Sequence, residues 1–213
     1  MRNHEVIIKQ PLLDQNGCLS EPGWSRQMVW EYRRGQIRAP KFRIKEWDYY
    51  LVLNDAFAGA FTISDDGYIG LQSVSLLNLK EGWEHTETIL NPFPMGKLCL
   101  PENSGRGKCV YQDKRLHMSF ETDGRSRRIR CLFRNFYQGK PFSCDILLRQ
   151  PDMDTMFIAT PFQEKKTAFY YNQKINCMPA SGFMKSAAAR TSSSACKSEG
   201  QAVLGRQDSL PTP

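Results

Sequence analysis

The chain has 213 residues, of which 40% are hydrophobic, 11% aromatic and 24% charged, with a net charge of +7. This composition is typical of globular proteins and excludes a chain that is disordered throughout. A chain of this length suits one large domain or two small ones, and it buries enough surface to fold without disulfides or metal ions.

The first part of the chain is predicted to hold short strands and one short helix. A strand is predicted at residues 5–9. Residues 25–34 repeat their large apolar side chains at helical spacing, which predicts a short helix. Residues 43–54 alternate along an extended chain and predict a strand that becomes apolar on both faces in its second half.

Two aspartate–glycine pairs predict β-hairpins. Asp66-Gly67 joins residues 56–64 to 68–79, and Asp123-Gly124 joins 115–122 to the run RRIRCLFR. Alternation in the second hairpin predicts an inward face made of Leu116, Met118, Phe120, Ile129, Cys131 and Phe133. The outward face would then carry Arg128, Arg130 and Arg134, which explains this basic cluster as the wet side of a strand.

The rest of the chain continues the β pattern until residue 183. Further strands are predicted near 86–91, 108–113, 143–149, 155–160, 167–171 and 173–178. About ten strands without intervening helices predict an all-β fold, an antiparallel barrel or sandwich. The β domain is expected to span residues 1–183. Residues 184–213 contain no aromatic residue and are rich in Ser and Ala, which predicts a disordered tail.

Several classes of site are disfavoured by the spacing of residues. The seven cysteines form no C-x-x-C pair, the three histidines are scattered, and no nucleotide-binding glycine motif is present. We therefore predict no metal site and no cofactor. The N-terminal segment lacks the apolar stretch of a signal peptide, and no window has the apolar length of a membrane span. A cytoplasmic protein with reduced thiols is expected.

The segment IKEWDYYLVLND, residues 44–55, is the most unusual part of the chain. Alternation places Trp47 and Tyr49 on one face and Glu46, Asp48 and Tyr50 on the other. We expect the face of Trp47 to be buried. The three aromatic residues of the segment, Trp47, Tyr49 and Tyr50, are candidate ligand-binding residues.

Glu46 and Asp48 place two carboxylates side by side. They could form a proton-transfer pair, because neighbouring like charges raise the pKa of one of them. The alternative is that each forms an ion pair with Arg43, Lys45 or the basic stretch before them, and this alternative is favoured because structural ion-pair networks are common.

The motifs LLDQNG (12–17), PGWSR (22–26) and IKEWDYY (44–50), with FYYNQKINCMPASG (169–182), resemble an uncharacterised family known as the domain of unknown function DUF2804. The similarity covers about residues 5–182. The family is itself distantly similar to lipocalin-like double-barrel proteins, including tocopherol cyclase and hydroxyneurosporene hydratase. This resemblance implies a β-barrel cavity for a hydrophobic molecule and carries over no functional residue.

Family members continue into a second half with a DWGRG-type motif, which this chain lacks. Because the β pattern also stops near residue 183, the chain is predicted to be a C-terminally truncated or frameshifted member. An incomplete barrel would leave an open sheet edge and permit self-association.

Three functions are compatible with these features. The leading hypothesis is a β protein that binds a hydrophobic or amphiphilic small molecule or lipid. The second is a prenyl or polyene lipid cyclase- or hydratase-like enzyme, in which Glu46 or Asp48 would act as the acid. The third is a basic nucleic-acid-binding module that uses residues 26–45, which the lack of any nucleic-acid-binding signature disfavours.

Overall fold

The computed structural model describes residues 4–186 and 200–208, the latter by their backbone alone. Apart from two short 3-10 helices, η1 (Arg34–Gln36) and η2 (Lys41–Arg43), the regular elements in these two ranges are β-strands. The all-β fold predicted from the alternation of apolar residues is therefore confirmed.

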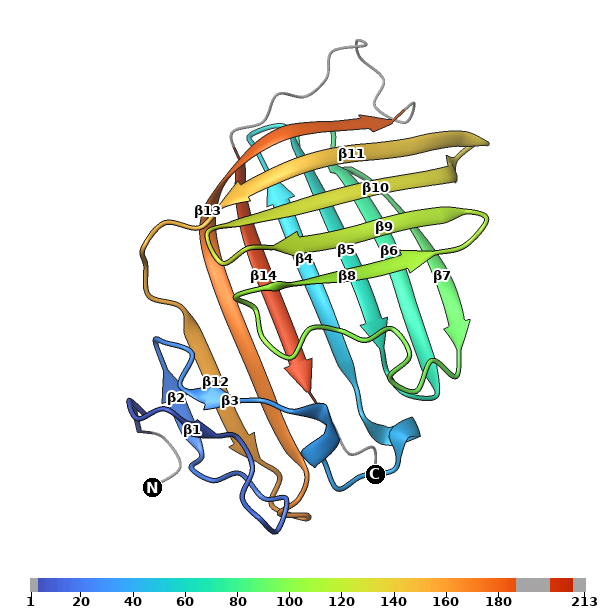
Figure 1. The fold of residues 1–213 in the computed structure, drawn as a ribbon. Helices are drawn as coiled ribbons and strands as arrows, with labels where there is room; N and C mark the ends of the chain where they lie inside the picture. The colour runs from blue at the N-terminus through green and yellow to red at the C-terminus, as the bar shows by residue number, and fades with distance from the viewer. Residues whose placement is uncertain (1–3, 187–199, 209–213) are drawn as a thin grey trace.

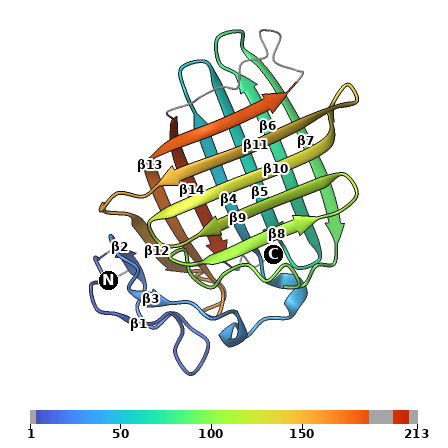
Figure 2. The ribbon, with the colours of Figure 1, turned by 45° about the horizontal axis from the view of Figure 1, so that its top comes forward.

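The strands form two layers that face each other and cross (Figure 1, Figure 2). The first layer contains β4 (Glu46–Leu53), β5 (Phe57–Asp65), β6 (Ile69–Asn78), β7 (Trp83–Pro92) and β14 (Gly200–Asp208). The second layer contains β8 (Gly107–Gln112), β9 (Leu116–Thr122), β10 (Ser126–Tyr137) and β11 (Lys140–Arg149). Neighbouring strands within each layer are antiparallel.

Strand β13 (Phe169–Ser186) belongs to both layers. Its first part pairs with β14 and with β12 (Met156–Pro161), and its last part pairs with β11. Between Ile175 and Met178 its register with β14 shifts, and Cys177 there has a left-handed φ of 61°. A bulge of this kind bends a strand and lets it pass from one layer to the next.

Gly182 permits the close pairing of β13 with β11. Its φ is 138°, and a Cβ atom built on it would lie 2.1 Å from the carbonyl oxygen of Asp145. A residue with a side chain would have to push the two strands apart at this point.

The architecture is an open sandwich. The continuous sheet runs from β7 to β8, and the structure shows no pairing between these two end strands. Of the two architectures predicted from the sequence, barrel or sandwich, the sandwich is correct.

The N-terminal segment forms a small unit against one end of the sandwich. Strand β1 (Gln10–Pro11) pairs with β3 (Trp30–Glu31), and β2 (Gly23–Ser25) pairs with β12. These residues and the first part of β13 enclose a second hydrophobic core around Trp30.

Two sequence predictions in this segment are wrong. The helix predicted at 25–34 is absent, because Ser25 pairs with β12 and Trp30 and Glu31 pair with β1. Trp30 and Tyr32 pack against Tyr171 of β13, while Met28 is exposed. The strand predicted at 5–9 is also absent, and Glu5 makes only an isolated bridge with Trp24. Contacts with distant segments outweigh a weak local preference in both cases.

The two predicted hairpins are confirmed. The amide of Asp66 donates to the carbonyl of Ile69 at 2.8 Å, and that of Asp123 donates to the carbonyl of Ser126 at 3.2 Å. The six residues predicted to face inward from the second hairpin are buried, while Arg128 and Arg134 are exposed. The two strands predicted at 167–171 and 173–178 are parts of the single strand β13.

The predicted tail, residues 184–213, lies partly outside the described residues. Residues 184–186 complete β13. Residues 200–208 have the backbone of β14, which lies between β4 and β13. Residues 187–199 and 209–213 are not described.

The main core fills the space between the two layers. Phe61 of β5 and Phe142 of β11 are fully buried, and their ring centroids lie 6.0 Å apart. Phe136 packs against Phe142 with tilted rings, whose centroids lie 5.1 Å apart. Contacts between aromatic side chains of opposite layers therefore hold the sandwich together.

Phe61→Ala and Phe142→Ala should each lower the free energy of unfolding by about 3–5 kcal/mol, because each leaves a cavity in a closed core. Chemical denaturation of both single variants and the double variant should give a coupling energy of about 0.5–1.5 kcal/mol. Leu90→Ala is the control, since this side chain is 60% exposed. Equal losses for the control and the two phenylalanine variants would contradict this packing.

Candidate ligand-binding cleft

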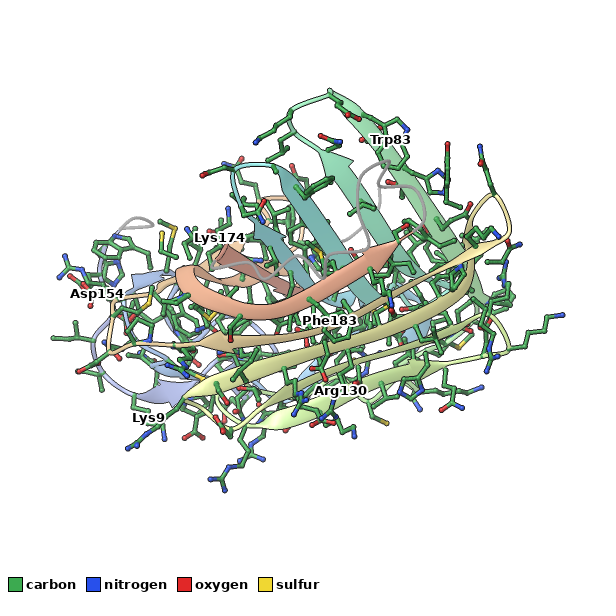
Figure 3. The ribbon with its side chains drawn as sticks, turned by 90° about the horizontal axis from the view of Figure 1, so that it is seen from above. Lys9, Trp83, Arg130, Asp154, Lys174 and Phe183 are labelled. Carbon is green, nitrogen blue, oxygen red and sulfur yellow. The ribbon has the colours of Figure 1, made fainter. Side chains whose placement is uncertain are left out.

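A cleft opens at the end of the sandwich that carries β12. Its walls come from five parts of the chain that are far apart in the sequence, at 27–28, 104–105, 124–127, 150–157 and Gln173. It has a volume of about 610 Å³. Asp154 marks this end of the molecule in Figure 3, and Trp83 lies at the other end.

Met28 separates this cleft from a second hollow. The second hollow, of about 410 Å³, is lined by Trp30, Tyr32 and Asn103 among others. Met28 lines both spaces and also a small cavity beside Phe157. One flexible thioether side chain thus stands at the junction of three hollows, and such a side chain adapts readily to different neighbours.

The connection between β7 and β8 forms one wall of the cleft. The Asn103 side-chain oxygen accepts the amide hydrogens of Gly105 (3.0 Å) and Arg106 (3.1 Å). Thr122 donates to the carbonyl of Ser104 at 3.4 Å. A Cβ atom on Gly124, whose φ is 93°, would lie 2.9 Å from the carbonyl oxygen of Gly105. The wall is therefore fixed against the hairpin of β9 and β10.

Arg127 lies at the inner side of the cleft. Only 3% of this residue is exposed. Its Nη2 donates to the side-chain oxygen of Gln150 at 2.8 Å, while its buried Nε has no acceptor among the described residues. The sequence analysis missed Arg127, although alternation places it on the same inward face as Ile129.

Asp48 and Tyr50 of β4 lie behind Arg127. With Arg127 they line a small inner cavity of about 10 Å³. Burial raises the pKa of Tyr50 to about 12; Asp48 acts in the same direction, and the positive charge of Arg127 acts against both. Tyr50 therefore stays protonated at neutral pH and can donate a hydrogen bond.

Glu46 is bound to the N-terminal segment. The hydroxyl of Tyr32 donates to its Oε1 at 2.5 Å, and Nη1 of Arg34 donates to its Oε2. Arg34 belongs to the basic stretch that the sequence offered as a source of ion pairs. Glu46 does not line the inner cavity of Asp48, so this cavity brings only one of the two carboxylates to Arg127.

The prediction that the Trp47 face of β4 is the buried one is wrong, because the opposite face lies in the interior. Glu46, Asp48 and Tyr50 face the interior, whereas Trp47 and Tyr49 are partly exposed on the outer side. The inner face holds polar residues because Tyr32, Arg34 and Arg127 reach it from distant parts of the chain. Of the three predicted aromatic ligand-binding residues, Tyr50 alone lines one of the hollows described above.

Arg128 and Arg130, which lie on the outer face of β10, are paired with carboxylates of neighbouring strands. Arg128 donates two hydrogen bonds of 2.7 Å to Asp145, which hold the pKa of that carboxyl below its usual range. Arg130, labelled in Figure 3, lies 3.7 Å from both Glu121 and Asp145. Within the described residues, no group of three or more His, Cys, Asp or Glu side chains could hold a metal ion.

The fold and this cleft define an open antiparallel β-sandwich with a mixed polar and apolar cleft at one end. The chain matches the family described as Domain of unknown function (DUF2804) over residues 3–206, and it belongs to that family. The resemblance based on IKEWDYY is thus confirmed. The match runs past residue 183 and into β14, beyond the span expected from the sequence.

No curated protein and no solved structure matches the chain. In the described part of the chain, none of the helices has the length and apolar character needed to cross a membrane.

Glu46→Gln should lower the free energy of unfolding by about 2–4 kcal/mol. Loss of one partner of a fully buried pair costs about 3–5 kcal/mol, and the Arg34 side chain here is 21% exposed. Glu31→Gln is the matched control, because Glu31 pairs with Lys9 at the surface and should cost less than about 1 kcal/mol. Urea denaturation measures both, and similar small losses would show that Glu46 contributes no buried pair.

Proposed function

We propose that the protein binds a small amphiphilic molecule in the cleft beside β12. The mixed lining of the cleft carries this proposal: Met28, Met153 and Phe157 supply apolar surface, and Arg127 and Gln150 supply polar groups. Small-molecule sites are typically concave and mostly apolar, with a few convergent polar groups, and occupy about 300–1,000 Å³. The volume of the cleft falls in this range.

The interior of the sandwich is less suited to a ligand. Phenylalanine side chains from both layers meet there and fill the space between the layers. Phe61 and Phe142, for example, are completely inaccessible to solvent. The lipocalin-like resemblance implied a cavity between the strands for a hydrophobic molecule. We place the ligand in the cleft at the end of the layers instead.

Binding is favoured over the lipid cyclase or hydratase alternative. Such an enzyme needs an acid that meets the bound lipid. Glu46 is covered by Tyr32 and Arg34, and Asp48 lines an inner cavity of about 10 Å³, which is too small for a lipid. Nucleic-acid binding through residues 26–45 has less support, because Arg26 lies 3.7 Å from both Glu5 and Asp154 and Arg34 pairs with Glu46. The proposed location is the cytoplasm, which the six free thiols among the described residues support.

Dodecanol and dodecanoate test the proposal with purified full-length protein. Saturable binding by calorimetry should be accompanied by stabilisation of about 2.7 kcal/mol at a free ligand concentration of about 100 times Kd. Failure of both probes to bind would refute the proposal.

Gly105→Phe should block the cleft and weaken binding of both probes by at least about tenfold. A Cβ atom on Gly105 meets only Asn103 Oδ1 at 3.4 Å and Met28 Cε at 3.7 Å, so the fold should tolerate the new side chain. Gly35→Phe is the matched control, because it adds the same group where no atom lies within 4 Å. Equal affinities for both variants would place the binding site elsewhere.

A further inference from the structure

We infer that the ligand of this cleft carries an anionic oxygen, from a carboxylate or a phosphate, and that Nε of Arg127 binds it. The inference rests on the proposed function and specifies its ligand class. It depends on three features of Arg127: its burial, its incomplete hydrogen bonding and its position between the cleft and the inner cavity.

Burial makes the open donor of Arg127 costly. The guanidinium is always charged, and a buried donor without an acceptor loses the hydrogen bond that it makes to water in the unfolded chain. Gln150 accepts from Nη2 at 2.8 Å, but Nε has no acceptor among the described residues. A ligand oxygen would satisfy this donor.

The fork of the guanidinium defines the geometry of the contact. Nε and Nη2 lie on one edge, the edge that commonly binds both oxygens of a carboxylate. The amide oxygen of Gln150 holds one of these two nitrogens, so one ligand oxygen is enough to complete the edge. Nε is buried from solvent, so a ligand oxygen reaches it only if neighbouring side chains move, and the hydrogen bond then forms without competition from water.

Arg127 forms part of the wall between two spaces. It lines the cleft together with Arg125 and Asp152, and it lines the inner cavity together with Asp48 and Glu121. Arg125 and Asp152 offset each other on the cleft side. On the side of the inner cavity, Glu121 is already paired with Lys108 at 2.6 Å, so its charge is largely balanced.

The apolar part of the ligand has a defined path from this point. Met153 and Phe157 line the cleft beside Arg127, and Met28 leads from it towards the second hollow. Methionine side chains adapt to ligands of different shape. The arrangement therefore suits an alkyl chain or small ring system attached to a carboxylate or a monoester phosphate.

Charge selectivity tests the inference. Wild-type protein should bind dodecanoate about 10- to 100-fold more tightly than dodecanol at pH 8 and low salt, as expected for a buried hydrogen bond to a charged group. Dodecyl phosphate is the third probe, and its affinity relative to dodecanoate identifies which anionic group is preferred. Dodecanol bound as tightly as both anions would overturn the inference and leave the proposed function standing, whereas no binding of any probe would refute both.

Arg127→Gln should abolish the preference for the anions, so that dodecanoate and dodecanol bind this variant with affinities within about threefold of each other. Arg125→Gln is the matched control, since Arg125 is an exposed arginine of the same cleft, and it should reduce anion affinity by no more than about threefold. A preference kept in Arg127→Gln but lost in Arg125→Gln would overturn the assignment to Arg127.

Thermal unfolding establishes whether Arg127→Gln is folded. If it is not, Arg127→Lys serves as the second variant, because lysine retains the charge but lacks the planar fork. Its anion preference should fall by about tenfold. An unchanged preference in a folded Arg127→Lys protein would show that a point charge is sufficient and that Nε is not the donor.

Discussion

The bend of β13 is the constraint on which the rest of the fold depends. One strand begins in the layer of β14 and ends in the layer of β11, so the bulge before Met178 sets how the two layers face each other. Gly182 lets the last part of the strand approach β11 without a clash. The first part of β13, before the bend, holds β12 and the N-terminal unit. The cleft exists because these pieces meet at one end of the sandwich.

The alternation of apolar residues correctly predicted those parts of the fold that depend on interactions between residues close in sequence. Both aspartate–glycine hairpins formed as expected, because turn geometry and a two-residue period fix their register. The helix predicted at 25–34 failed because pairing with β12 and β1 overrides a short apolar repeat. The continuity of β13 was equally hidden, since the break predicted at residue 172 falls at the polar run Asn172, Gln173 and Lys174. The bulge at Cys177 coincides with the predicted end of the second strand at residue 178. Pairing between distant segments leaves no periodic signal in one sequence.

The residues of the candidate site were also hard to predict, because contacts between distant segments determine their surroundings. Alternation correctly separated Trp47 from Glu46 and Asp48, but the size of the indole suggested the wrong inward face. The inner face tolerates carboxylates only because Tyr32 and Arg34 arrive from the N-terminal unit. Arg127 could have been found from its position two residues before Ile129. It was overlooked because arginines on a strand usually face water.

Two arginines near this end of the sandwich differ in how their charges are paired. Nη1 of Arg34 meets a carboxylate of the same chain, Glu46, so its charge is balanced within the chain, although its buried Nη2 has no acceptor among the described residues. Arg127 is more deeply buried, yet within the described residues its hydrogen bond to Gln150 involves a neutral amide and Nε is left open. A buried charge is tolerated when neighbouring groups form hydrogen bonds with it and carry the opposite charge. At Arg127 the acceptor for Nε is missing and the residue lines a cleft, so a ligand oxygen is the group that would supply this hydrogen bond.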